Sequence, residues 1–118
     1  IVSVQNPVRL DDHGEPQPDL TVIRPRDYRE SLPNPEDVLL LIEVSDTTLR
    51  YDREVKLPLY AGAGIREVWI VDLPGETVER HTEPSTDGYD LVQRVRRGNT
   101  LRPEALPALA VPVDAVFG

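Results

Sequence analysis

The chain has 118 residues, of which 39% are hydrophobic and 29% charged, and this length suits a single domain with a hydrophobic core. Its formal net charge of -8 argues against capture of nucleic acid by a broad basic surface. The absence of cysteine excludes disulfides and thiolate metal sites and suits a reducing cytoplasm, and no apolar run is long enough to span a membrane.

The first half of the chain predicts strands joined by loops. Residues 1–4 and 8–10 indicate an interrupted strand, and residues 19–23 indicate a short strand rich in β-branched side chains. The charged stretch 24–37 contains three prolines and predicts a surface loop. Residues 38–44 are almost all apolar, which is typical of a strand buried on both faces of a sheet. Because the chain contains no methionine, we expect an N-terminal piece to precede it.

Residues 47–61 predict a helix after the central strand. Its apolar side chains recur at i, i+4 and predict the buried face: Tyr51, Val55 and Leu59. Pro58 removes one backbone hydrogen bond, so we expect a kink there, and Gly62 and Gly64 predict the end of the helix.

The remaining elements are predicted to be strands. Residues 67–72 form a second buried strand, residues 77–82 and 89–95 a more exposed hairpin, and residues 109–113 a short strand before a terminal turn. Alternation of strands with a helix predicts an α/β fold, and we expect residues 1–118 to form one domain with a single sheet.

Glu43 is the anomaly of the central strand. A carboxylate among leucine, isoleucine and valine side chains carries a large desolvation cost unless it is paired, protonated or bound to a metal. It lies near the C-terminal end of the run, where open α/β sheets place their ligands. The alternative is an exit residue that turns to solvent.

Asp19 opens the preceding strand. If the two strands are neighbours, Asp19 and Glu43 converge on one hard cation, with the Val44 carbonyl as a third oxygen. Two carboxylates completed by waters and a phosphate are a usual site for magnesium. The alternative for Asp19 is a turn-forming residue after a proline.

Lys56 is the only lysine, against twelve arginines. An ammonium is a compact charge whose pKa responds to burial, whereas a guanidinium stays protonated, so the one retained lysine points to a role that arginine cannot fill. We expect it at the edge of the buried helix face, within reach of the sheet end. The alternatives are chance and a surface ion pair with Asp52 four residues earlier.

These motifs together resemble the Uma-two (Uma2) family of restriction endonucleases in the PD-(D/E)XK nuclease superfamily. The resemblance covers residues 5–72 well and the tail loosely, and it is carried by these segments: Pro18-Asp19-Leu20, Leu41-Ile42-Glu43-Val44-Ser45, Tyr51-Asp52-Arg53 with Lys56 and Tyr60, and residues 61–72. In the superfamily pattern a lysine lies two residues after the second acid, and this chain has Ser45 at that position. The chain resembles the family in carrying the lysine on the following helix instead, at Lys56. The loop at residues 43–48 also differs from the usual family sequence.

The resemblance implies a restriction endonuclease-like fold, in which a mixed central sheet has helices on both faces. It also implies Mg²⁺ or Mn²⁺ bound by Asp19 and Glu43, a catalytic Lys56, and an N-terminal helix in the part that is missing from this chain. The expected partner is then nucleic acid, with DNA preferred to RNA, and the expected location is the cytoplasm. A homodimer is also expected, because such domains commonly pair to cut two strands.

Three functions are compatible with these residues. The first is a metal-dependent endonuclease that hydrolyses phosphodiester bonds. The second is an inactive nuclease-fold module that binds nucleic acid or a protein, which the acidic net charge favours; the third is a hydrolase of small phosphoesters. A histidine mechanism is not expected, because His13 lies in a polar turn and His81 in an exposed strand with no serine or cysteine nucleophile beside it.

Overall fold

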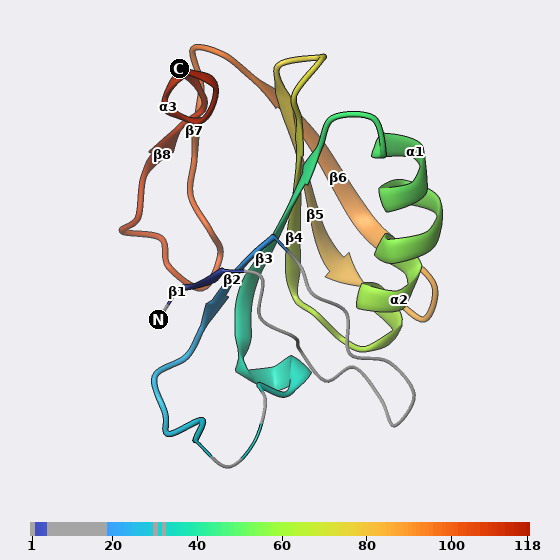
Figure 1. Ribbon diagram of the computed structural model, residues 1–118, viewed down its shortest axis with the longest axis vertical. Coiled ribbons are helices and arrows are strands. Elements are labelled where there is room, and N and C mark those ends of the chain that lie inside the picture. Colours follow the sequence, from blue (N-terminus) through green and yellow to red (C-terminus); the bar gives the residue numbers. More distant parts are fainter. Residues whose placement is uncertain (1, 5–18, 30, 32) are drawn as a thin grey trace.

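A mixed β-sheet forms the centre of the protein (Figure 1). The computed structural model describes residues 2–4, 19–29, 31 and 33–118. Within them, six strands pair in chain order: β1 (Val2–Val4), β2 (Leu20–Ile23), β3 (Val38–Ser45), β4 (Glu67–Asp72), β5 (Thr77–Pro84) and β6 (Tyr89–Arg96). Neighbours are antiparallel except for β3 and β4, which are parallel. The predicted α/β class is confirmed, and residues 8–10 lie outside the described residues. The expectation of a single sheet is wrong, because two short C-terminal strands pair with each other in a separate two-stranded sheet.

The parallel pair β3 and β4 needs a crossover connection, and a helix supplies it. This helix runs without a break through three segments: α1 (Leu49–Tyr51), the π-helical η2 (Asp52–Lys56) and α2 (Leu57–Gly62). It covers one face of the sheet, while the C-terminal elements lie on the other side (Figure 1). These are β7 (Thr100–Leu101), β8 (Val111–Pro112) and α3 (Val113–Phe117), and a short 3₁₀-helix, η1 (Pro35–Asp37), precedes β3.

Two hydrophobic clusters, one on each face, hold these layers together. On the helix side, Leu57 and Tyr60 pack against residues from β2, β3 and β4. On the other side, Trp69 and Val78 pack against Leu101 and Val113 from the C-terminal elements. Because β3, β4 and β5 are covered on both faces, β5 is largely buried and the predicted exposed hairpin is exposed mainly along β6.

The irregularity expected at Pro58 takes the form of a widened helical turn. The Leu57 amide donates to the Asp52 carbonyl, five residues back, and Pro58 follows directly with no amide hydrogen to offer. Gly62 and Gly64 end the helix as predicted, and Gly64 adopts a positive φ of 84° that suits a glycine.

The predicted buried face of this helix is wrong. The side chains of Tyr51, Val55 and Leu59 are 54%, 41% and 57% exposed. The face turned to the sheet instead carries Asp52 and Tyr60, which are each 1% exposed. The physical reason lies in the sheet, where buried carboxylate and hydroxyl groups need polar partners from the helix.

His81 is also placed wrongly by the sequence analysis, because it is 5% exposed rather than a surface residue. Its Nε2 lies 3.2 Å from Glu79 Oε1, and the Arg53 guanidinium pairs with the same carboxylate. Burial lowers the pKa of His81, with the hydrogen bond to Glu79 acting in the opposite direction. The imidazole is therefore neutral at pH 7 and serves packing; His13 lies outside the described residues.

Asp37 ties the loop before β3 to its own backbone and to two arginines. Its carboxylate accepts hydrogen bonds from Arg24 Nε at 2.6 Å, from Arg26 Nη2 at 2.7 Å and from the Asn34 amide at 2.8 Å. The hydrogen bond from Arg26 has the largest effect in holding the pKa of Asp37 well below its ordinary value, and burial acts in the opposite direction.

Asp37→Asn is expected to destabilise the protein by about 2 kcal/mol at pH 7, because charge-assisted hydrogen bonds to a buried group are lost. A depressed carboxyl pKa contributes stability above the unfolded pKa of about 4, and this contribution is lost as the pH falls below that value. Urea unfolding followed by Trp69 fluorescence should therefore show the two proteins converging at acid pH. A difference that is equal at pH 7 and pH 2.5 would contradict this assignment.

Candidate active site

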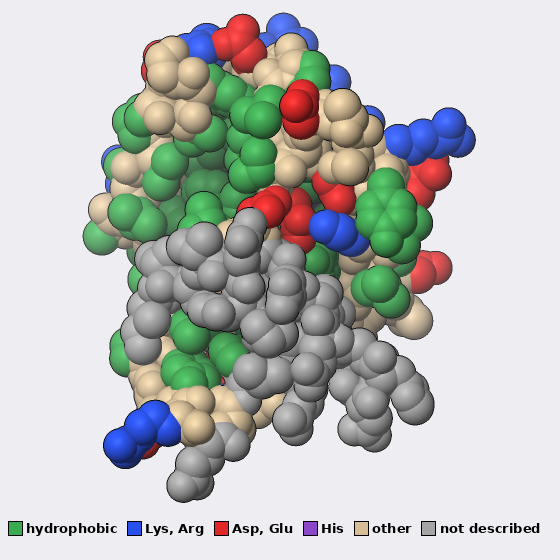
Figure 2. All heavy atoms as spheres, viewed as in Figure 1, with side chains coloured by type: hydrophobic (Ala, Val, Ile, Leu, Met, Phe, Trp, Pro, Cys, Tyr) green, Lys and Arg blue, Asp and Glu red, His purple; other side chains and the backbone are tan. Residues whose placement is uncertain are grey.

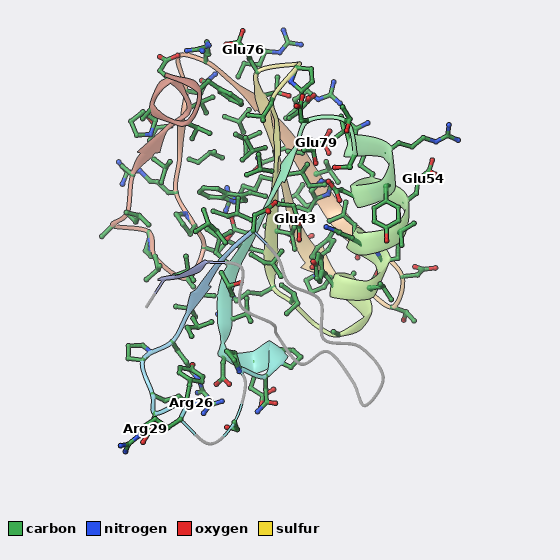
Figure 3. All side chains as sticks on the ribbon, in the orientation of Figure 1. Arg26, Arg29, Glu43, Glu54, Glu76 and Glu79 are labelled. Atoms are coloured by element: carbon green, nitrogen blue, oxygen red, sulfur yellow. The ribbon has the colours of Figure 1, made fainter. Side chains whose placement is uncertain are left out.

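Glu43 lies in β3 on the face covered by the helix, where its side chain is buried (Figure 3). Its carboxylate accepts a hydrogen bond from the Tyr60 hydroxyl to Oε1 at 2.7 Å and one from Lys56 Nζ to Oε2 at 3.0 Å. Both donors come from the crossover helix, one turn apart. Lys56 thus reaches the sheet end as predicted, and it contacts the strand carboxylate directly.

The charge on Glu43 is incompletely compensated. Burial raises the pKa of Glu43, and the neighbouring charge of Asp19 raises it further, while the bonds from Tyr60 and Lys56 lower it without cancelling the increase. Burial, with the adjacent Glu43 charge, also raises the pKa of Tyr60 far above its ordinary value, so that its hydroxyl remains a donor. The two donors therefore do not fully offset the cost of burying the Glu43 carboxylate.

Lys56 is a protonated ammonium at neutral pH. Burial lowers the pKa of Lys56, but the hydrogen bond from Lys56 to Glu43 and the charges of Glu43 and Asp52 outweigh this, so the net shift is upward. Its side chain is 31% exposed, so Lys56 is only partly buried. The group can donate hydrogen bonds and neutralise developing charge.

Asp19 reaches the same end of the sheet from β2. Leu20 pairs with Ile42 in antiparallel register, which brings Asp19 opposite Glu43. Asp19 Oδ2 accepts a hydrogen bond from the Val44 amide at 2.7 Å, so the carboxylate is held against β3. The structure brings Asp19, Glu43 and Lys56 together, while ligation by the Val44 carbonyl remains a prediction.

Asp52 is the residue that the sequence analysis missed. It was considered only as a surface partner of Lys56, yet it is 1% exposed. Its Oδ2 accepts hydrogen bonds from the Ser45 hydroxyl and from Thr48 Oγ1, and its Oδ1 lies 3.4 Å from Lys56 Nζ. Within the described part of the chain, this Oδ1 has no hydrogen-bond partner, so it faces the ammonium alone. The i, i+4 spacing of Asp52, Lys56 and Tyr60 is the sequence pattern that could have indicated that Asp52 lies on the same helix face as the other two.

The donor set fits a hard divalent cation held by two carboxylates. Asp19 and Glu43 offer carboxylate oxygens, the ligands that Mg²⁺ and Mn²⁺ prefer. Burial is the main cause of the raised pKa of Glu43, and a bound cation would stabilise its charged form. In the residues that the structure describes, no group of three or more His, Cys, Asp or Glu side chains could hold a metal ion. Waters and substrate oxygens would therefore have to complete the coordination shell.

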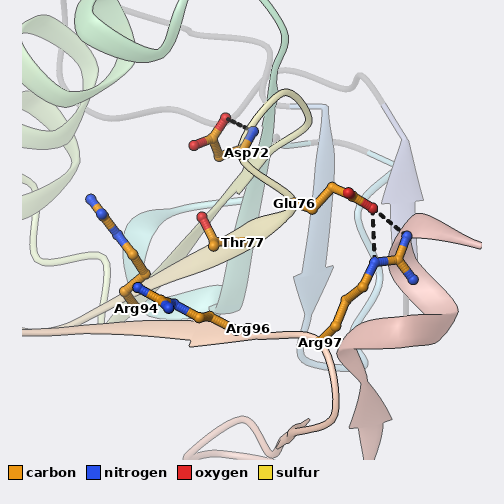
Figure 4. A pocket seen from close by; sticks show the side chains of 7 residues that line it. Asp72, Glu76, Thr77, Arg94, Arg96 and Arg97 are labelled. Atoms are coloured by element: carbon orange, nitrogen blue, oxygen red, sulfur yellow. Dashed lines mark hydrogen bonds and ion pairs between the residues drawn. The ribbon is translucent and has the colours of Figure 1, made fainter.

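A second polar hollow lies at the β4–β5 turn and does not share this chemistry (Figure 4). It has a volume of about 380 Å³ and is lined by Asp72, Thr77 and three arginines of β6 and the following turn, among other residues. Its two acidic side chains are Asp72 and Glu76, and Arg97 pairs there with Glu76. The acids offset most of the basic charge, so the hollow is not a strong anion site.

Comparison with known proteins returns one family. The family model Uma2, described as "Putative restriction endonuclease", matches residues 1–114. A search of curated proteins finds no match. In the described part of the chain, no helix is both long and apolar enough to cross a membrane.

Proposed function

This chain belongs to the Uma2 restriction endonuclease family, and on that premise we propose that it is a metal-dependent endonuclease that hydrolyses phosphodiester bonds in nucleic acid, DNA before RNA. The observation that carries this proposal is the contact of 3.0 Å between the only lysine, Lys56, and the buried carboxylate of Glu43, with Asp19 beside them. The proposal treats residues 1–118 as one nuclease domain acting in the cytoplasm.

Asp19 and Glu43 would hold Mg²⁺ or Mn²⁺, with the Val44 carbonyl as a third oxygen. When bound, such an ion lowers the pKa of a water molecule and neutralises charge on the scissile phosphate. The protein's own contribution begins with the spacing of the two carboxylates, which the register of β2 against β3 determines. The Tyr60 hydroxyl fixes the Glu43 carboxylate by donating a hydrogen bond to Oε1.

Lys56 would act on the attacking water and on the phosphate. Because its pKa is raised, its ammonium orients the water by donating a hydrogen bond and stabilises negative charge that develops on the phosphate oxygens. Glu43 and Asp52 flank the ammonium and restrict where it points. This arrangement favours positioning over proton abstraction as the role of Lys56.

Cleavage by the purified chain tests the proposal directly. Wild type, Lys56→Ala and the control Arg66→Ala, which removes an exposed cation away from the site, are incubated with single- and double-stranded DNA and RNA. We expect cleavage that requires Mg²⁺ or Mn²⁺, that stops in EDTA, and that Lys56→Ala loses while Arg66→Ala keeps it. Equal cleavage by wild type and Lys56→Ala would show that the activity comes from elsewhere.

A binding module is the second candidate, and the net charge of -8 favours it, because an inactive domain does not have to attract a polyanionic substrate. Under that function, wild type would cut none of the four substrates with either metal but would retain a nucleic-acid or protein partner. A homodimer, which would let two sites cut two strands, is tested by sedimentation of the same samples.

A further inference from the structure

The exposed side of the crossover helix carries an apolar stripe that the core does not use. The stripe consists of Tyr51, Val55 and Leu59, each more than two-fifths exposed. Figure 2 shows hydrophobic side chains on the outer side of this helix, next to charged side chains between helix and sheet. Isolated exposed apolar residues are ordinary, but three on successive helical turns form a continuous surface.

The stripe borders the candidate active site. Tyr51 precedes Lys56 by five residues, and the segment between them is π-helical, with bonds from i to i+5. Tyr51 is followed directly by Asp52, whose Oδ1 lies 3.4 Å from Lys56 Nζ, so the stripe begins beside a residue of the site. Val55 and Leu59 continue the surface along the same helix, beside Lys56 and Tyr60.

The acidic net charge of the protein bears on how such a stripe could help to bind nucleic acid. With a net charge of -8, the chain cannot depend on broad electrostatic attraction to hold a polyanion. Stacking of a nucleobase on an aromatic ring needs no net positive charge and tolerates any base. Arg50, which is exposed and pairs with Glu54 one helical turn further on, could meet an adjacent phosphate at little cost.

We propose that Tyr51 is a stacking platform for an unpaired nucleobase next to the bond that is cut, with Val55 and Leu59 extending the apolar contact. The preferred ligand is then single-stranded nucleic acid, because a base within a duplex has no free face to offer the ring. This inference rests on the proposed function, since it names the substrate class of the same site.

The test measures binding without cleavage. A single-stranded DNA oligonucleotide containing 2-aminopurine, and its duplex form, are titrated in EDTA with wild type, Tyr51→Phe, Tyr51→Ala and Leu91→Ala. Leu91 is a matched control because it is 43% exposed on β6, outside the helix. We expect stacking to quench the probe, Tyr51→Ala to weaken single-strand binding about tenfold, and Tyr51→Phe and Leu91→Ala to bind within about twofold of wild type. The duplex should bind wild type about tenfold more weakly than the single strand.

Three results would overturn the inference. Tyr51→Ala could bind the single strand as tightly as wild type, or the duplex could bind as tightly as the single strand. Sedimentation could also show a wild-type dimer that Tyr51→Ala converts to a monomer, in which case the stripe is an interface between two copies. Tyr51-dependent binding without any cleavage in Mg²⁺ or Mn²⁺ would refute the endonuclease while leaving the platform in place. Cleavage by wild type together with unaltered binding by Tyr51→Ala would refute the platform while leaving the endonuclease in place.

Discussion

Lys56→Arg is expected to lose at least about 100-fold in cleavage rate although it keeps the positive charge. The ammonium fits between two carboxylates, 3.0 Å from Glu43 Oε2 and 3.4 Å from Asp52 Oδ1. A planar guanidinium is larger and fixes its donors in a fork, so it cannot take the same position between these oxygens and also orient a water. Single-turnover cleavage in Mg²⁺ measures the loss.

The fold should survive this substitution, because the Lys56 side chain is 31% exposed and its outer end can move toward solvent. Thermal unfolding of Lys56→Arg within a few degrees of wild type is the control for an intact protein. Arg66→Lys, a change of the same kind in the reverse direction at an exposed position, should cut at the wild-type rate. Wild-type cleavage by Lys56→Arg would leave Lys56 as a charge that steers phosphate and nothing more.

Glu43→Gln is expected to abolish metal-dependent cleavage and most metal binding. The amide keeps the shape of the side chain but removes one of the two carboxylates that would hold the ion. Wild type should gain about 2.7 kcal/mol of stability at a metal concentration one hundred times the dissociation constant, and Glu43→Gln should gain almost none. Calorimetric titration with Mn²⁺ and thermal unfolding with and without the metal measure the two effects.

Without metal, the same substitution should change stability by less than about 1 kcal/mol. It removes the ion pair to Lys56, but it also removes a buried carboxylate whose charged form is destabilised, and these contributions oppose each other. Because the Glu43 pKa is raised in the folded state, this carboxyl favours folding at low pH, and its contribution declines as the pH rises through the folded pKa. Glu43→Gln should lack that decline. Identical Mn²⁺ binding by both proteins would mean that Glu43 is not a ligand.

The sequence by itself determined where most of the strands lie along the chain and the identity of the three candidate site residues. Residues 67–72 form β4 with the predicted bounds, and Glu43, an acid inside an apolar run, lies buried as its setting indicated. These features depend on neighbours in the chain, because side-chain alternation, apolar runs and helix-stopping glycines act over a few residues. The family resemblance, carried by the ordered set of sequence motifs, was confirmed over residues 1–114.

Only the tertiary structure decided which polar side chains are buried. The i, i+4 pattern assigned Tyr51 and its stripe to the core, whereas Asp52 and Tyr60 occupy that face because Ser45 and Glu43 on β3 need their hydrogen bonds. His81 is buried because Glu79 holds it, and Glu79 is in turn paired with Arg53 from the helix. A polar residue goes inside when partners distant in sequence compensate its desolvation, and no local pattern reports whether those partners will be there.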